Sequence, residues 1–227
     1  MRWVPLEANP DVMNAWCAKL GLDTSRASFC DIYGLDPDLL AMVPQPVYAV
    51  LLLFPVTDAY EKHREEERVA TKHQDEAVSH AIYFKQTIGN ACGTMGLLHG
   101  LANSDAPIGS DTPLRRLFER CTDATPLERA KLLEHDSELE AAHSETAQTG
   151  QTAAPDADAK VDLHFVAFVA VRGRLLELDG RKDSPIDHGP VSSLLTDTAK
   201  VITDKFLRFA GDSLQFSLMA LAGTNDE

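Results

Sequence analysis

The sequence predicts a mixed α/β protein of the α+β class, folded as one domain. Its 227 residues, 44% of them hydrophobic, are enough to enclose a single sizeable core. The run Val47–Phe54 is bounded by prolines and is apolar throughout, which is typical of a central strand covered on both faces. The segments Val161–Val171 and Arg174–Asp179 flank a two-residue turn and predict an antiparallel hairpin.

Cap residues followed directly by proline mark the starts of three helices, because proline is well tolerated in the first helical turn. The three pairs are Asn9-Pro10, Thr112-Pro113 and Thr125-Pro126. We expect the first of these helices to end at Gly21 and the third to extend to about Ala142.

Two further helices and a last strand complete the expected elements. Asp58 and Glu61 have the spacing of a capping box before a charged helix, whose clustered glutamates we interpret as a solvated face. Another helix is expected over Val191–Ala210, and a buried strand over Leu214–Leu221. The short tail after Gly223 is expected to fray.

The chain carries 21 basic and 35 acidic residues, for a formal net charge of −14. Such a surface repels the phosphates of nucleic acids and anionic lipids, so neither nucleic acid nor a membrane is an expected partner. It attracts basic partners. The alternative interpretation is that the charge serves only to keep a soluble protein monomeric.

The four cysteines are too widely spaced to resemble a disulfide framework, so we expect free thiols. They are Cys17, Cys30, Cys92 and Cys121. The amino terminus lacks the basic start and long apolar stretch of a secretory signal, and the longest apolar run is too short to span a bilayer. These observations favour the cytoplasm, with the nucleus as a second compartment.

Residues 143–159 contain small and polar side chains, one proline and no large apolar residue, which is typical of a mobile loop. A loop of this length is unusual inside a compact domain, and such loops often act as lids or binding elements. An insertion without a function is the alternative. The position of this loop just before His164 favours a functional role.

Cys92 lies in the segment QTIGNACGT, at the expected start of a helix that Asn90 would cap. A helix amino terminus stabilises a thiolate and lowers the thiol pKa, and its backbone N–H groups suit an oxyanion. Because cysteine is among the most buried residue types, a structural role is the alternative. The other three cysteines have no upstream glutamine and no glycine directly after them, so we expect no catalysis from them.

A thiol hydrolase also needs a histidine and a group that orients its ring. His164 begins an apolar strand, where a polar ring requires a buried partner, although a hydrogen-bonded core histidine would satisfy the same pattern. With a two-residue turn at Arg172-Gly173, the residue numbers of opposed positions in the hairpin sum to 345. This register places Asp179 across from Val166 and diagonal to His164. A bulge would shift this register.

Gln86 lies six residues before Cys92. Its side-chain amide is able to donate to an oxyanion together with the backbone N–H of Cys92. A glutamine upstream of a helix is ordinarily a polar loop residue. In combination with a helix-capped cysteine, it repeats the layout of papain-like thiol proteases.

Five segments of the chain together resemble the ubiquitin carboxyl-terminal hydrolases, a family of papain-like deubiquitinases with one small catalytic domain. They are RWVPLEANPDVMNAW, DIYGLDPDLLAMVPQPVYAVLLLFP, QTIGNACGT, VDLHFVAF and ELDGRKDSPIDHG. The resemblance covers nearly the whole chain and implies a single catalytic domain over residues 1–227. The fold that it implies is papain-like, with a central antiparallel β-sheet flanked by helices on both faces and a knotted backbone path.

The resemblance implies that Cys92 is the nucleophile, His164 the general base and acid, Asp179 its orienting partner and Gln86 the oxyanion donor. It also identifies the stretch at about 143–159 as an active-site crossover loop. The implied enzyme is a deubiquitinating thiol protease, which cleaves small adducts or short peptides from the terminal glycine of ubiquitin through a thioester. It requires no metal or organic cofactor.

Two alternatives stay open at this point. The chain is a candidate ubiquitin-binding module that stabilises free ubiquitin, with its catalytic set secondary, or a papain-like protease of unrelated peptides, which has no support beyond the triad. The basic tail of ubiquitin, which ends in two glycines, suits an acidic protein with a narrow channel near Cys92. Nedd8, a close relative of ubiquitin, is a further candidate substrate.

Overall fold

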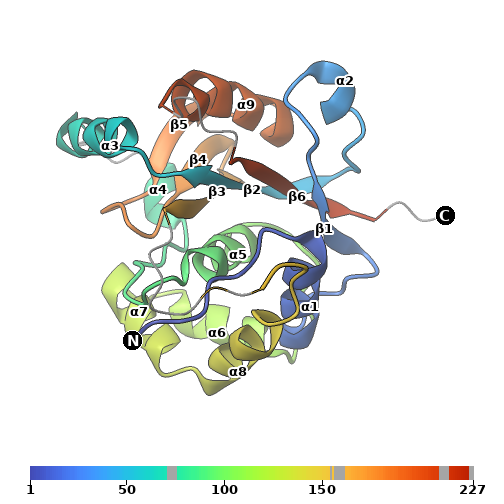
Figure 1. The fold of residues 1–227 in the computed structure, drawn as a ribbon. Helices are drawn as coiled ribbons and strands as arrows, with labels where there is room; N and C mark the ends of the chain where they lie inside the picture. Colours follow the sequence, from blue (N-terminus) through green and yellow to red (C-terminus); the bar gives the residue numbers. More distant parts are fainter. Residues whose placement is uncertain (71–75, 154, 156–161, 210–214, 225–227) are drawn as a thin grey trace.

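The fold is organised around a six-stranded antiparallel sheet in the order β1-β6-β2-β3-β4-β5 (Figure 1). The strands are β1 (Ala27–Asp31), β2 (Val47–Pro55), β3 (Leu163–Val171), β4 (Arg174–Leu178), β5 (Ile186–Pro190) and β6 (Ser217–Gly223). The computed structural model describes residues 1–70, 76–153, 155, 162–209 and 215–224. Strand β2 lies inside the sheet between β6 and β3, as its apolar sequence predicts.

Helices cover both faces of this sheet (Figure 1). They are α1 (Pro10–Leu20), α2 (Pro37–Leu40), α3 (Asp58–Ala70), α4 (Glu76–His80), α5 (Cys92–Ala102), α6 (Pro113–Cys121), α7 (Pro126–Glu134), α8 (Ser137–Thr146) and α9 (Leu194–Val201). Helices α1, α5, α6, α7 and α8 lie on one side, and α9 lies on the other with α2. The predicted α+β class, with a central antiparallel sheet between helices, is confirmed; the knotted path stays an expectation.

Alternating residues of the central strands feed two separate cores. Leu51 of β2 and Phe165 of β3 belong to the larger core, which includes α1 and α5. Their neighbours Leu52 and Val166 belong to the smaller core under α9. Because successive side chains of a strand point to opposite faces, one continuous apolar run serves both layers. Among the described residues, none of the helices has the length and apolar character needed to cross a bilayer.

The helix predicted from Pro126 to about Ala142 is in fact two helices. The capping box of Thr125 and Glu128 starts α7 as predicted, but α7 ends at Glu134. Asp136 then caps α8, since its carboxylate accepts the N–H of Leu139 at 3.0 Å. An aspartate that bonds nearby backbone N–H groups favours a new helix start over continuation.

Helix α8 extends to Thr146, so the predicted loop begins later than residue 143. His143, assigned to that loop from sequence, is buried. Its Nε2 donates to the carbonyl of Val4 at 2.7 Å, and its Nδ1 therefore accepts from the Thr94 hydroxyl at 2.8 Å. Burial lowers the pKa of His143 to about 4, so the ring is neutral. Residues 154 and 156–159 of the predicted loop lie outside the described residues.

Other predicted boundaries shift because side chains cap the elements at different positions. The Thr57 hydroxyl, rather than Asp58, caps α3 by accepting the N–H of Tyr60 at 3.1 Å. Ser193 caps α9, which starts at Leu194 instead of Val191.

The end of the chain differs from the prediction in two respects. Helix α9 continues as a π-helical turn over Ile202–Phe206 and a 3₁₀ turn over Leu207–Phe209. The last strand covers Ser217–Gly223, and the next residue, Thr224, donates its N–H to Arg26 at 3.1 Å, so it is held in place. Residues 210–214 and 225–227, where the helix and tail predictions end, lie outside the described residues.

Candidate active site

Cys92 is the first residue of α5. The N-cap position is Ala91, and within the described part of the chain no side chain caps this helix, so the prediction that Asn90 caps it is wrong. Asn90 instead adopts a φ of 61°, a left-handed conformation that asparagine tolerates, directly before the helix. The backbone N–H groups of the first turn are consequently left for an anion beside the sulfur.

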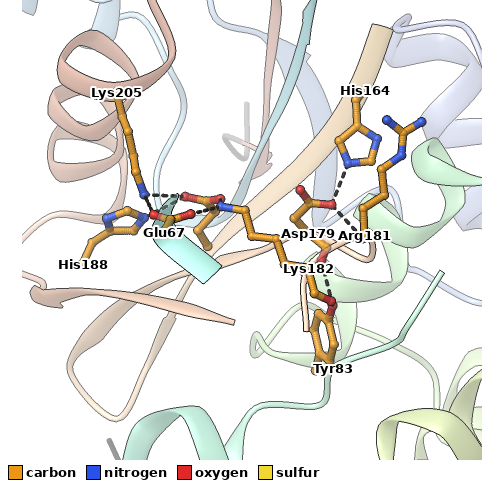
Figure 2. A network of polar contacts seen from close by, with 9 residues as sticks. Glu67, Tyr83, His164, Asp179, Arg181, Lys182, His188 and Lys205 are labelled. Carbon is orange, nitrogen blue, oxygen red and sulfur yellow. Dashed lines mark hydrogen bonds and ion pairs between the residues drawn. The ribbon is translucent and has the colours of Figure 1, made fainter. Parts of the chain in front are cut away.

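His164 and Asp179 meet as the hairpin register predicts. Strands β3 and β4 pair with Ala167 opposite Leu178 and without a bulge. The residue numbers of opposed positions therefore sum to 345, as predicted. His164 Nε2 lies 2.6 Å from Asp179 Oδ1, and the two side chains are 1% and 0% exposed (Figure 2). A carboxylate only accepts, so Nε2 carries the proton and Nδ1 is the ring nitrogen left for Cys92.

Cys92 and His164 shift each other's pKa. Burial raises the pKa of the Cys92 thiol, but the contact with His164 and its charge, helped by the backbone of Phe165 and by Arg181, outweigh burial and lower it. Burial lowers the pKa of His164, but Asp179 and Cys92 outweigh it and raise the pKa to about 9. Both shifts favour a thiolate–imidazolium pair near neutral pH.

A cavity of about 310 Å³ opens beside Cys92. Its walls come from the amino-terminal segment, from β2 and β3, and from the described residues that follow α8. The lining residues are Pro5, Leu6, Glu7, Ala8, Leu53, Cys92, Ala147, Thr152, Pro155, Leu163 and Phe165. Glu7 also accepts the backbone N–H of Thr152 at 3.3 Å, which links the two rims of the cavity.

Gln86 contacts the turn formed by residues 179–182, which we call the Asp179 turn. Its backbone N–H donates to the carbonyl of Gly180 at 2.9 Å. Its side-chain Nε2 donates to the carbonyl of Ile88 at 3.2 Å, which leaves the second hydrogen of the amide for another acceptor. The structure therefore brings Cys92, His164 and Asp179 together by their side chains and ties Gln86 to them through the backbone.

Gly180 allows the close approach of this turn to Gln86. A β-carbon at position 180 would lie 2.9 Å from Gln86 Cβ and 3.2 Å from Gln86 N. We expect Gly180→Ala to lower kcat about tenfold, because the turn and the amide donor must move apart. Steady-state kinetics would measure the loss. The matched control is Gly96→Ala in α5, where the added methyl meets only Leu51 and Phe165 at 3.4 and 3.7 Å; equal kinetics for both variants would contradict the prediction.

Residues 3–207 match the family model described as ubiquitin carboxyl-terminal hydrolase, family 1. The chain belongs to this family. Among its relatives, ubiquitin carboxyl-terminal hydrolase 3 of Arabidopsis thaliana is 47% identical over 228 residues, covering 97% of this chain and 94% of the relative. Ubiquitin carboxyl-terminal hydrolase isozyme L1 of Rattus norvegicus is 40% identical and covers 97% and 98%.

The fold of this family member also matches a solved structure. The catalytic domain of Trichinella spiralis UCH37, bound to ubiquitin vinyl methyl ester, superposes with a TM-score of 0.79 at 21% identity. The match covers 99% of this chain and 96% of that one. At this level of identity the likeness establishes the fold, which is the one that the sequence resemblance implies.

Sequence reasoning missed two charged residues beside the site. Glu177 and Lys182 flank Asp179 in sequence and form a buried ion pair. Glu177 lies in the apolar segment LLELD, so the argument that a buried polar residue needs a partner, applied to His164, also applies to it. For Lys182, in the polar turn GRKDS, no such signal exists.

Proposed function

We propose that this chain is a cysteine-type ubiquitinyl hydrolase, which cleaves small adducts or short peptides from the carboxyl-terminal glycine of ubiquitin. The observation that carries the proposal is the contact set of Cys92, His164 and Asp179 beside an open cavity at a helix amino terminus. The relatives named ubiquitin carboxyl-terminal hydrolase, at 40–47% identity, support the same substrate. In the solved neighbour, the ligand is a ubiquitin derivative.

The reaction begins with the Cys92 thiolate and the His164 imidazolium. The sulfur attacks the carbonyl carbon of the terminal glycine and forms a tetrahedral oxyanion. Collapse of this intermediate breaks the bond to the leaving amine or thiol, which takes the proton of His164. Water, deprotonated by the now neutral ring, hydrolyses the thioester and restores the thiolate. Asp179 keeps the ring oriented through both steps.

The oxyanion requires donors that are in place before the reaction. The uncapped first turn of α5 offers backbone N–H groups next to Cys92. The Gln86 amide has one hydrogen beyond its bond to Ile88, and its backbone is anchored to Gly180. We assign the oxyanion to these two sources.

We further propose that the segment after α8 is the crossover loop that the substrate tail passes. Ala147, Thr152 and Pro155 line the cavity that contains Cys92, which supports this role. The remaining walls are mostly apolar, which suits an extended tail of glycines without charged side chains. Glu7 and the net charge of −14 would attract the basic residues before those glycines.

Three finer parts of the proposal extend beyond the family relationship. We propose Nedd8 as a second substrate, a monomeric state, and action in the cytoplasm or nucleus within ubiquitin-dependent protein catabolism. A free thiolate nucleophile supports a reducing compartment, and all four cysteines are free thiols, as the sequence predicts. Size-exclusion chromatography with light scattering would test the monomer.

The central test is release of a fluorescent amine from the carboxyl terminus of ubiquitin by the purified chain, with the Nedd8 conjugate in parallel. Release from ubiquitin would support the hydrolase, and the ratio of kcat/KM values would rank the two substrates. Tight binding of ubiquitin without release would overturn the enzyme and favour the ubiquitin-binding module. Release only from unrelated peptides would instead indicate a general thiol protease.

The pH dependence of kcat/KM should have two limbs. As the pH falls through the lowered pKa of Cys92, the thiolate is protonated and the rate falls. As the pH rises through about 9, His164 loses the proton that the leaving group needs, and the rate falls again. Measurement of kcat/KM from about pH 5 to about pH 10 would show this bell-shaped profile. Enzyme returned to neutral pH serves as the control for unfolding; a single rise centred near an ordinary histidine pKa would contradict the ion pair.

A further inference from the structure

A buried cluster of charges lies beside the turn that holds Asp179 (Figure 2). Glu177, two residues before Asp179, is fully buried, and Lys182, three residues after it, is 9% exposed. The Lys182 ammonium lies 2.5 Å from Glu177 Oε1 and 2.6 Å from Glu67 Oε2. Helix α3, strand β4 and the Asp179 turn therefore meet at one nitrogen. The sequence interpretation of the α3 glutamates as a solvated face is wrong for Glu67, whose side chain is 13% exposed.

Each oxygen of the two carboxylates has its own partner. The second oxygen of Glu67 pairs with Lys205, and the second oxygen of Glu177 lies 2.9 Å from His188 Nε2. Two carboxylates thus face two ammonium groups and one imidazole (Figure 2). A fully partnered buried network has one low-energy arrangement, so it fixes the backbone that carries it.

The same turn is held on its other side by the segment that leads to Gln86. The Tyr83 hydroxyl lies 2.7 Å from the carbonyl of Asp179 and 2.5 Å from that of Lys182, and shares its proton between them. The Lys85 ammonium donates to the Lys182 carbonyl at 2.6 Å. Since the Lys182 N–H also donates to the Asp179 carbonyl at 2.9 Å, the turn is closed on itself. Among these anchors, Lys182 is the one whose side chain reaches the buried carboxylates.

We propose that Lys182 is a positioning residue, whose buried ammonium fixes the turn so that Asp179 holds His164 in the orientation needed at Cys92. The inference rests on the hydrolase function proposed above. Its physical basis is that a buried ion pair contributes little more net stability than an apolar pair of the same volume, because both charges lose their hydration. The ion pair is distinguished from an apolar pair by its directional contacts, and these contacts determine where the turn lies.

A charge-balanced double variant separates positioning from electrostatics. Lys182→Met with Glu177→Gln removes one positive and one negative charge, and leaves Glu67 paired with Lys205. The titratable and charged groups around Asp179, His164 and Lys182 come from α3, α5, β4, the turn after β4, β5, the π-helical turn and the segment before Gln86. Besides the substituted pair, they are Tyr60, Glu67, Tyr83, Lys85, Cys92, His99, Arg181, Asp183, His188 and Lys205.

We expect the double variant to fold and bind ubiquitin as the parent chain does, but to lose about tenfold to a hundredfold in kcat, with KM changed by less than about twofold. Because Asp179 no longer holds the ring firmly, the pKa of His164, about 9 in the parent, should fall. The basic limb of the kcat profile and an NMR titration of the His164 ring would both report that fall. A purely structural role would lower the melting temperature and leave the basic limb in place.

Two further variants complete the design. Lys205→Met removes an ammonium from the same cluster but no part of the turn, and should keep kcat within about twofold of the parent. Lys182→Arg keeps the cation but not the position of its donors, so its kcat should lie between those of the parent and the double variant. It also provides a folded comparison if the double variant unfolds. Parent kcat with an unmoved basic limb, in the folded double variant or in Lys182→Arg, would overturn the inference, and so would an equal loss of kcat in Lys205→Met. Absence of cleavage by the parent would overturn the proposed function and this inference with it.

Discussion

Cys92→Ala is expected to abolish cleavage of ubiquitin conjugates, with a loss of at least about 10⁴-fold in kcat, because alanine has no thiol with which to form the thioester. Cys92 is 9% exposed, and the smaller alanine removes only the sulfur and adds no steric clash, so the variant should stay folded. Release of the fluorescent amine would measure the loss. The affinity for ubiquitin, measured by calorimetry, should change little, because the proposed tail site includes the apolar cavity walls as well as the sulfur.

The matched control for this experiment is Cys30→Ala. Cys30 lies half-buried on the edge strand β1, and burial, followed by the charge of Asp31, raises the pKa of its thiol. Its loss should leave kcat unchanged. Cleavage by Cys92→Ala at the parent rate would refute the nucleophile assignment. Loss of the cellular role in the same variant would favour the enzyme, whereas survival of that role would favour the ubiquitin-binding module.

Asp179→Asn is expected to lower kcat by about 10³-fold to 10⁴-fold, with KM nearly unchanged. The carboxylate accepts the proton-bearing Nε2 of His164 and the N–H of Arg181 on the same oxygen. An amide cannot stabilise the imidazolium in this way, so the pKa of His164 should fall from about 9 toward its ordinary value. Less thiolate would form at neutral pH, and the orientation of the ring would be lost.

The control for this variant is Asp183→Asn, on the same turn. Asp183 is largely exposed and pairs with Lys85 at 3.1 Å, so its loss should change kcat by less than about twofold. Kinetics over the full pH range would separate the two carboxylates. A basic limb that stays near 9 in Asp179→Asn would show that the ring depends on other groups.

Local chemistry made a large part of the fold predictable. Proline and glycine at helix ends placed α1, and the capping box placed the start of α7, because these signals depend on residues in immediate sequence contact. The predicted hairpin register held, since a two-residue turn with positive φ at Arg172 and Gly173 leaves a single pairing. From that register alone, His164 and Asp179 could be predicted to meet.

Other features depended on contacts between distant residues. Strands β1 and β5 are short edge strands without a strong apolar pattern, and they are defined by pairing with β6 and β4. His143 looked like a loop residue, yet the carbonyl of Val4 gives its ring a buried partner from the other end of the chain.

The sequence by itself determined the candidate site residues, the register that joins His164 to Asp179, and the family. Those features follow from periodicity, turn length and motif spacing, which act over a few residues. Only the tertiary structure decided how the Asp179 turn is held. The Lys182 ammonium finds Glu67 across 115 residues of chain, and no local pattern encodes a contact at that separation. Since burying such charges is favourable only when every oxygen and ammonium has its partner, their positions follow from the packed fold as a whole.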